Sequence, residues 1–122
     1  LFKPINDRHG HIRGDEVLRQ VAAVLRRHAR SDDVAARIGG EEFALLLPEC
    51  TAADAAMLAD RLREAVESTM FAPGGEAQRI TVSIGVAALA PHRDSRQALM
   101  AAADAALYRA KSEGRNRVCV SD

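Results

Sequence analysis

The sequence predicts an α/β protein of the α+β class, with a mainly antiparallel sheet flanked by helices. Three stretches carry apolar residues at helical spacing, and several shorter runs have the pattern of strands. A double glycine joins two of these strand-like runs, as in a tight hairpin. Helices and hairpins alternate too irregularly for a doubly wound parallel sheet. The length of 122 residues is that of one ordinary domain, so residues 1–122 are predicted to form a single unit.

The chain begins with an apolar stretch and continues into an amphipathic helix. Residues 1–7 predict one short helical turn, because Pro4 is tolerated where its missing N–H donor would be unpaired anyway. An exposed loop is expected over residues 8–13. Asp15 is predicted to cap the helix that follows, which has apolar residues on one face and ends near Ala29.

A hairpin is predicted in the centre of the sequence. The strand-like run of residues 34–38 leads directly into Gly39 and Gly40. Glycine permits positive φ and lacks the Cβ atom that would keep a ligand away from the backbone. Residues 43–47 are apolar on both faces of a strand, which predicts that this strand is buried on both sides.

The second half of the chain begins with another helix. Thr51 starts this helix, with Asp54 three residues later in a capping-box arrangement, and the helix is expected to end before residues 73–75. Residues 80–86 alternate between apolar and more polar side chains. This alternation predicts a strand with one more polar face.

The last predicted elements are a helix and a closing strand. The helix opens at residues 94–97 and ends at Gly114, the usual C-terminal position for glycine. Residues 118–120 are expected to form the strand. One more strand would complete this layout, and we expect it to precede Leu1. The sequence starts abruptly without a methionine, which indicates a piece of a longer protein.

Composition excludes several classes of protein. Lysine and arginine together number 17, as do aspartate and glutamate, so no broad basic surface for nucleic acid or an anionic membrane is expected. There is no apolar run long enough to span a bilayer and no signal-peptide pattern. Cys50 and Cys119 lack metal-ligand spacing and are interpreted as small buried side chains in a reducing compartment. These features predict a cytoplasmic domain with no membrane contact of its own.

Two adjacent acids, Glu41 and Glu42, follow the double glycine at the mouth of an apolar strand. Carboxylates in this place can hold a hard cation such as Mg²⁺, which binds carboxylates and substrate phosphates together. They can equally be solvated turn residues. The motif alone leaves both interpretations open.

Several separated motifs occur along the chain. They are Phe2-Lys3-x-Ile5-Asn6-Asp7, Gly10-His11-x-x-Gly14-Asp15, Gly39-Gly40-Glu41-Glu42-Phe43, Ser83-Ile84-Gly85-Val86, and Ala103-Asp104-x-Ala106-Leu107-Tyr108-x-Ala110-Lys111-x-x-Gly114-Arg115-Asn116. In this order they resemble the GGDEF domain family, the diguanylate cyclases, which join two GTP into cyclic di-GMP. The resemblance covers nearly the whole chain and implies a ferredoxin-like nucleotidyl-cyclase fold, in agreement with the predicted order of elements.

The resemblance implies catalytic and metal-binding roles. Glu41 matches the acid that holds Mg²⁺ or Mn²⁺, at least two ions per active dimer, and that is linked to deprotonation of the attacking 3′-hydroxyl. Glu42 is expected to assist it, and Lys3 matches a lysine near the triphosphate, where its charge would stabilise the transition state. The family's other metal-binding Asp would lie before Leu1. We therefore expect this chain by itself to bind metal and GTP poorly, and the parent protein to be active.

The resemblance also implies a set of substrate-binding residues, in which Asn6 and Asp15 read the guanine edge and Lys111 and Arg115 contact phosphates. The matching positions are Phe2, Asn6, His11, Asp15, Gly39, Gly40, Lys111 and Arg115. Simpler interpretations exist for these residues. Asp15 can be a plain helix cap, Asn6 a turn residue, and the Lys111–Arg115 pair a favourable charge at a helix end.

Arg30 and Asp33 fit the family's RxxD inhibitory motif, where bound cyclic di-GMP would be held, and Arg61 matches a secondary contact to the same product. As four letters, this motif is otherwise typical of a solvated turn. Its position shortly before Gly39 favours product inhibition.

The resemblance finally implies partners and leaves two alternatives. Two domains, each with one GTP, must face each other, so a homodimer is expected, organised by an upstream sensor or regulatory domain that is cytoplasmic or membrane-anchored. One alternative is an inactive receptor that binds GTP or cyclic di-GMP without turnover. The other is a non-nucleotide module of similar fold, such as an RNA-binding one. It is disfavoured because only 3% of the residues are aromatic and could stack on bases.

Overall fold

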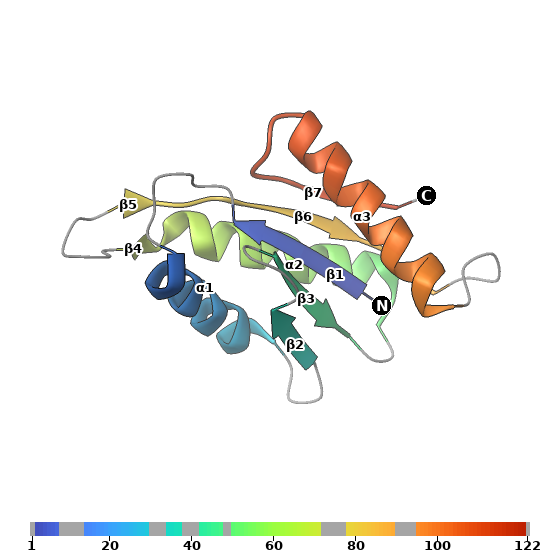
Figure 1. Cartoon of the computed structure of the whole chain (residues 1–122), viewed down its shortest axis with the longest axis horizontal. Coiled ribbons are helices and arrows are strands. Elements are labelled where there is room, and N and C mark those ends of the chain that lie inside the picture. Colours follow the sequence, from blue (N-terminus) through green and yellow to red (C-terminus); the bar gives the residue numbers. More distant parts are fainter. Residues whose placement is uncertain are drawn as a thin grey trace.

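The computed structural model describes residues 2–7, 14–29, 34–37, 42–47, 50–71, 78–89 and 95–121. Within these residues the chain forms three helices and seven strands (Figure 1). In chain order the elements are β1 (Phe2–Asp7), α1 (Gly14–His28), β2 (Val34–Arg37), β3 (Glu42–Leu46), α2 (Ala52–Ser68), β4 (Met70–Phe71), β5 (Gln78–Arg79), β6 (Val82–Val86), α3 (Arg96–Ser112) and β7 (Val118–Val120).

The main sheet has the strand order β2-β3-β1-β6-β7, with β1 in the centre. The β2–β3, β1–β3 and β1–β6 pairs are antiparallel, as predicted. The β6–β7 pair is parallel, so the antiparallel prediction is wrong at this edge. A parallel pair requires a long crossover, and α3 provides it between the two strands. Strands β4 and β5, which the sequence did not predict as a pair, form a separate two-stranded sheet.

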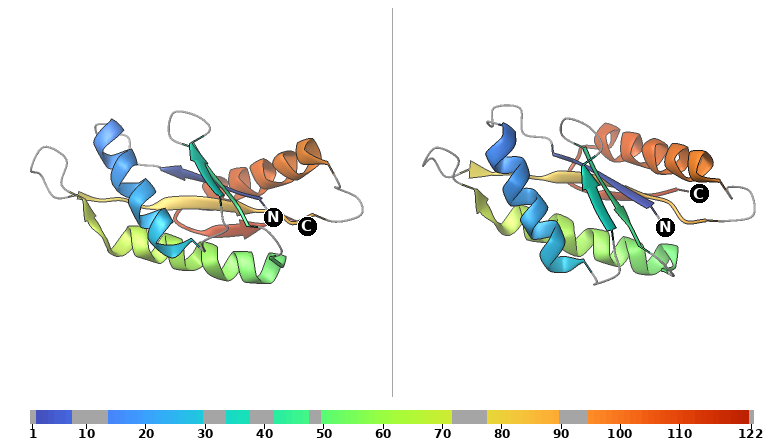
Figure 2. Two further views of the ribbon diagram at one scale, coloured as in Figure 1. Left: turned by 90° about the horizontal axis from the view of Figure 1, so that it is seen from below. Right: turned by 60° about the horizontal axis from the view of Figure 1, so that its bottom comes forward.

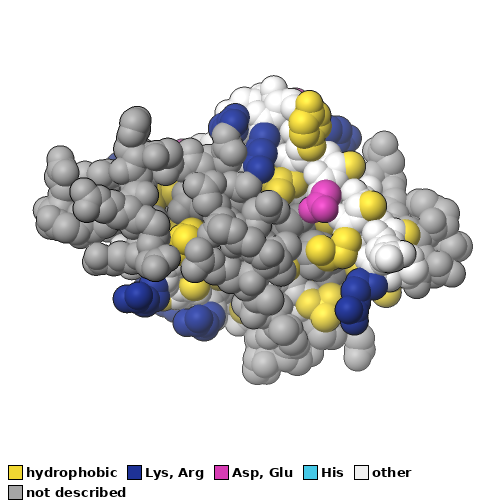
Figure 3. Space-filling view, in the orientation of Figure 1, with side chains coloured by type: hydrophobic (Ala, Val, Ile, Leu, Met, Phe, Trp, Pro, Cys, Tyr) yellow, Lys and Arg dark blue, Asp and Glu magenta, His cyan; other side chains and the backbone are white. Residues whose placement is uncertain are grey.

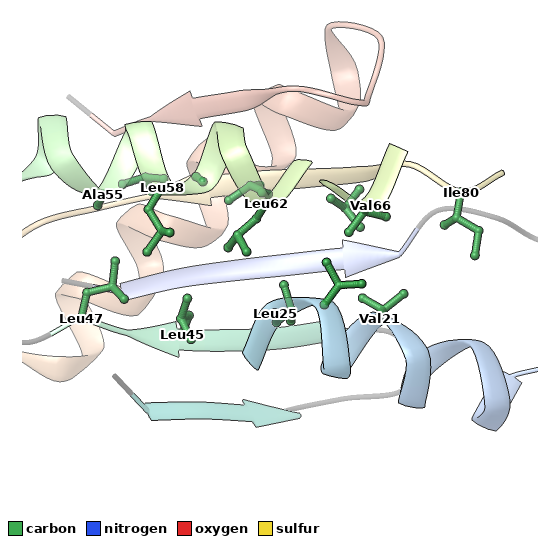
Figure 4. Packing of buried hydrophobic residues seen from close by; sticks show 14 of the residues in the cluster. Val21, Leu25, Leu45, Leu47, Ala55, Leu58, Leu62, Val66 and Ile80 are labelled. Carbon is green, nitrogen blue, oxygen red and sulfur yellow. The ribbon is translucent and has the colours of Figure 1, made fainter. Parts of the chain in front are cut away.

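Helices cover both faces of the main sheet. Figures 1 and 2 show α1 and α2 on one face and α3 on the other. The larger core lies between the sheet and the α1–α2 layer, where Leu25, Leu45 and Leu62 are fully buried (Figure 4). A smaller cluster, which includes Ala44 and Ala103, lies beneath α3. The described residues contain no helix long and apolar enough to cross a membrane.

The short helical turn predicted for residues 1–7 is wrong, because Phe2–Asp7 forms the central strand β1. This strand pairs with β3 from Phe2 to Asn6, and with β6 from Ile5 to Asp7. Strands β3 and β6 are therefore both paired with β1. Pro4 is tolerated in β1 because the pairing with β6 begins only one residue later. Pairing with β3 on one side and with β6 on the other outweighs the local preference of this segment for a helical turn.

The predicted ends of the second and third helices are confirmed. Thr51 Oγ1 accepts a hydrogen bond from the Asp54 N–H at 3.1 Å, and Ser95 Oγ accepts one from the Ala98 N–H at 3.1 Å. Gly114 follows α3 with a φ of 121°. In α1, by contrast, the helix already begins at Gly14, so Asp15 lies in the first turn and is not the cap that was predicted.

Two burial predictions for the strands need correction. Leu45 and Leu47 are fully buried, but Leu46 is 44% exposed, so β3 is not covered along its whole length on both sides. In β6 the face predicted to be more polar is fully buried, including Ser83. Helix α3 covers this face of β6 closely. A Cβ atom added to Gly85 would come within 2.3 Å of the Ala103 carbonyl oxygen.

The Ser83 hydroxyl is fully buried and has no hydrogen-bond partner among the described residues. An unpaired buried hydroxyl carries a desolvation cost. We therefore expect Ser83→Ala to raise the free energy of unfolding by up to about 1 kcal/mol. Urea denaturation of both proteins measures this change. A clear loss of stability in the variant would show that the hydroxyl is paired in solution.

Candidate functional site

Four residues lie side by side across the strands at one end of the sheet, and we call them the transverse row. They are Glu42, Asn6, Ser83 and Arg117, which directly precedes β7. Asn6 of β1 lies opposite Glu42 of β3 and Ser83 of β6. Next to Ser83, the Ile84 N–H donates to the Arg117 carbonyl at 3.0 Å, which places the start of β7 at the same level. With adjacent strands 4.7–4.9 Å apart, the row is about 14 Å long.

Several predicted site residues belong to segments that leave the sheet at this end. Because β1 and β2 run toward the row and β3 runs away from it, β1 and β2 end here, and β3 begins here after its connection to β2. That connection contains Gly39, Gly40 and Glu41, which lie outside the described residues, as does His11 after β1. Figures 1 and 2 show the N-terminal turn of α1, which carries Asp15, beyond this end of β1.

The structure does not bring Phe2 and Lys3 to the row. They lie at the opposite end of β1, where Phe2 pairs with Leu46 and Lys3 with Leu45. Lys3 and Asn6 are three positions apart in the strand, a distance of about 10 Å along it. The Lys3 backbone therefore lies at the other end of β1 from Glu42, a residue with which the resemblance gave it a shared catalytic role.

Lys111 and Arg115 lie at the C-terminal end of α3, beside the row. The Arg115 N–H donates to the Ala110 carbonyl at 2.9 Å, which closes the helix in a Schellman motif around Gly114. Arg115 Nη1 also donates to the Lys111 carbonyl at 3.4 Å, so the simpler helix-end role of this pair is present in the structure. Figure 3 shows Lys and Arg side chains gathered around this end of α3.

The turn after α3 has an unusual backbone. Gly114, Arg115 and Asn116 have consecutive positive φ values of 121°, 64° and 48°. Positive φ is uncommon for a residue other than glycine, and each instance costs about 1 kcal/mol or more. Two consecutive non-glycine residues keep this conformation only where surrounding contacts enforce it.

Those contacts come from α2, through a group that we call the Arg63 network, formed by Asp60, Arg63, Glu67 and Asn116. Arg63 Nη1 donates to Glu67 Oε1 at 3.1 Å and to Asn116 Oδ1 at 3.1 Å. Asn116 Nδ2 donates to Glu67 Oε2 at 2.7 Å. Arg63 Nε also donates to Asp60 Oδ1 at 2.8 Å. This hydrogen bond lowers the pKa of the Asp60 carboxyl and raises that of Arg63.

Arg63 and Glu67 were not among the residues predicted from the sequence. Their spacing of four residues on one helix was the available signal, since it allows an ion pair on any helix. No local pattern indicated their contact with Asn116, which lies 53 residues beyond Arg63.

The residues predicted to bind product are only partly described. Arg61 is exposed on α2 and lines an open groove with Ala56, Met57 and Asp60. Arg30 and Asp33 lie outside the described residues. The two cysteines are free and half-buried, and burial raises the pKa of the Cys119 thiol.

The oxygen donors predicted to hold a metal ion belong to Glu41 and Glu42. The described residues contain no group of three or more side chains suited to hold a metal ion. Glu41 lies outside those residues, and Glu42 begins β3 opposite Asn6. Two adjacent carboxylates at the end of a strand suit a hard divalent cation, so the donor set fits Mg²⁺ or Mn²⁺.

Comparison with known proteins gives consistent results. Residues 1–117 match the family described as diguanylate cyclase, GGDEF domain. The chain is 45% identical over 120 residues to the response regulator PleD of Caulobacter vibrioides, covering 97% of this chain and 26% of PleD. It is 42% identical over 121 residues to diguanylate cyclase A of Treponema denticola, covering 99% of this chain and 33% of that protein. The chain thus spans about a third or less of these relatives.

Solved structures agree in fold. The GGDEF domain of DgcB from Caulobacter crescentus, in complex with c-di-GMP, superposes with a TM-score of 0.88 at 38% identity, covering 98% of this chain and 75% of that one. The active GGEEF domain of a diguanylate cyclase from Vibrio cholerae gives a TM-score of 0.89 at 28% identity, covering 99% and 81%. On the family match over almost its full length, this chain belongs to the GGDEF diguanylate cyclase domain family.

Proposed function

We propose that this chain is the catalytic domain of a diguanylate cyclase, which condenses two GTP into cyclic di-GMP and two pyrophosphates. The main support is the transverse row, in which Asn6 and Glu42 are directly paired and the turn carrying Arg115 opens at the same level. A nucleotide needs a base-reading group, a phosphate-binding group and an acid close together. Segments that carry all three leave the sheet at this end.

In each half of the reaction, the 3′-oxygen of one GTP forms a bond to the α-phosphorus of the other GTP. The bond from that phosphorus to pyrophosphate breaks, pyrophosphate leaves with the electron pair, and the 3′-hydroxyl gives up its proton. Two such steps close the ring, so two domains must face each other as a homodimer. An upstream sensor or regulatory domain in the parent protein would control this pairing.

The residues of this chain have distinct roles in the proposal. Asn6 and Asp15 hydrogen-bond the guanine, while Lys111 and Arg115 bind and orient the phosphates. Glu41 and Glu42 would hold Mg²⁺ or Mn²⁺, which when bound supplies positive charge against the phosphate oxygens. Glu41 also accepts the proton of the 3′-hydroxyl. The remaining assigned residues are Phe2, Lys3, His11, Gly39 and Gly40.

Product inhibition is the second part of the proposal. Arg30, Asp33 and Arg61 would bind cyclic di-GMP away from the catalytic residues and slow its formation. The exposed position of Arg61 beside a groove on α2 supports a ligand contact there. The DgcB domain that superposes on this chain was solved with c-di-GMP.

The test supplies GTP and Mg²⁺ to the protein as the cell makes it and measures both products. We expect two pyrophosphates for each cyclic di-GMP, and no product once EDTA has removed the metal. Added cyclic di-GMP should lower the rate in the wild type and less so in Arg61→Ala. Binding of GTP without any product would instead identify a receptor domain.

A further inference from the structure

The Arg63 network connects two parts of the fold that are distant in sequence. Arg63 and Glu67 lie on α2, beneath one face of the sheet, and Asn116 follows α3, which covers the other face (Figure 2). Arg63 is only 17% exposed in its side chain and Glu67 is 46% exposed, so the hydrogen bonds between them are partly shielded from water. The network therefore ties the turn after α3 to the main body of the domain.

Both polar atoms of the Asn116 side chain are hydrogen-bonded. Its oxygen accepts from Arg63 and its nitrogen donates to Glu67, which in turn accepts from Arg63 through its other oxygen. The three side chains form a closed ring of hydrogen bonds. Such a ring fixes the position of the Asn116 backbone, which has positive φ.

Arg115 precedes Asn116 and shares the positive-φ backbone. Its side chain is exposed, and its contact within the described residues is the 3.4 Å hydrogen bond to the Lys111 carbonyl. The direction in which Arg115 leaves the turn is thus set by the backbone, and the backbone is held by the ring through Asn116.

We propose that Arg63, Glu67 and Asn116 are positioning residues that hold the turn after α3 in its left-handed form and so place the Arg115 guanidinium for binding polyphosphate. This inference rests on the proposed function for the role of Arg115. It adds three residues that act through the backbone and do not contact the substrate. The ligand group affected is the triphosphate chain of a nucleotide, whichever base the nucleotide carries.

The experiment exchanges the two groups that meet at 2.7 Å. In Glu67→Gln the carboxylate becomes an amide, and in Asn116→Asp the amide becomes a carboxylate. The double variant keeps the net charge and restores the hydrogen bond with donor and acceptor reversed, while Arg63 can still donate to both partners. Isothermal titration calorimetry measures the affinity of the protein, as the cell makes it, for inorganic tripolyphosphate, for a non-cleavable GTP analogue and for guanosine.

We expect each single variant to bind tripolyphosphate and the GTP analogue about tenfold more weakly, and the double variant to recover most of the loss. Guanosine affinity should stay unchanged in all three. Charge alone would act differently, because removing the Glu67 carboxylate would strengthen phosphate binding and adding one at position 116 would weaken it. A loss in both single variants therefore indicates geometry.

A second variant separates the amide from the backbone strain. Asn116→Gly deletes the side chain, but glycine adopts the φ of 48° without strain. We expect it to lose affinity for tripolyphosphate even where its melting temperature matches the wild type. The control Asp104→Asn removes an exposed carboxylate from α3 outside the network and should change no affinity.

Several results would overturn the inference. They are an unchanged tripolyphosphate affinity in the single variants, an equal loss of guanosine affinity, failure of the double variant to recover, or no binding of tripolyphosphate by the wild type. The proposed function fails separately. A wild type that binds tripolyphosphate and shows the expected pattern, but never converts GTP, would disprove the cyclase proposal and leave the positioning role intact.

Discussion

Glu41→Gln is expected to lower the rate of cyclic di-GMP formation at least about 100-fold, because phosphoryl transfer depends on charge neutralisation at the phosphates. The substitution keeps the size of the side chain and removes the charge that would hold the metal and accept the 3′-hydroxyl proton. Product formation is measured by chromatography with GTP and Mg²⁺ in excess. The melting temperature should not change, since the variant side chain has the same size as the original.

Asp104→Asn is the matched control for this experiment, since it removes one carboxylate from an exposed position on α3. It should retain the wild-type rate. If Glu41→Gln also retains that rate, the acid after the double glycine has no part in the chemistry and the metal assignment is wrong. If neither the wild type nor the variants form product although they bind GTP, the domain is a receptor.

Gly85→Ala is expected to lower the free energy of unfolding by about 3 kcal/mol or more. The added Cβ would lie 2.3 Å from the Ala103 carbonyl oxygen, 2.4 Å from the Leu107 nitrogen and 2.9 Å from the Leu107 Cα. All three atoms belong to the backbone of α3, so no side-chain rotation can relieve the contact. The helix would have to move off β6 and open the cluster beneath it. Urea denaturation measures the loss.

Gly114→Ala provides the comparison, because it adds the same methyl group at a different kind of site. There the nearest atom is Nη2 of Arg117, the end of a flexible side chain, although the φ of 121° is unfavourable for alanine. We expect a loss of about 1–2 kcal/mol.

Shortening Leu107 to alanine should fail to rescue Gly85→Ala. A stable Gly85→Ala protein, or rescue by that second change, would show that α3 is not seated on the glycine.

The helices and their ends could be predicted from local sequence, because helical periodicity and capping depend on residues a few positions apart. Thr51 and Ser95 act as caps as their sequences indicated, and Gly114 ends α3. The hairpin around the double glycine was also predictable, and β2 and β3 pair as expected. Motif order along the chain was sufficient to identify the family, as the match over residues 1–117 confirms.

The predictions that failed depended on contacts between distant segments. The peptide around Pro4 has no strong strand pattern, and it becomes the central strand because β3 and β6 both pair with it. The polar alternation of β6 predicted an exposed face, but α3 covers it at Gly85. The pairing of Asn6 with Glu42 follows from strand register, which no local pattern determines.

The sequence by itself determined the family, the three helices and the residues to consider for a guanine nucleotide, because these follow from short-range patterns and motif order. Tertiary structure alone decided which of those residues share one end of the sheet, and that Lys3 lies at the other end of its strand. It also decided that Arg63 and Glu67 form hydrogen bonds with Asn116 in the turn after α3. Bringing segments about 50 residues apart together costs conformational entropy, and the burial of apolar side chains between the layers offsets this cost. Hydrogen bonds between such segments therefore form only when the layers have packed.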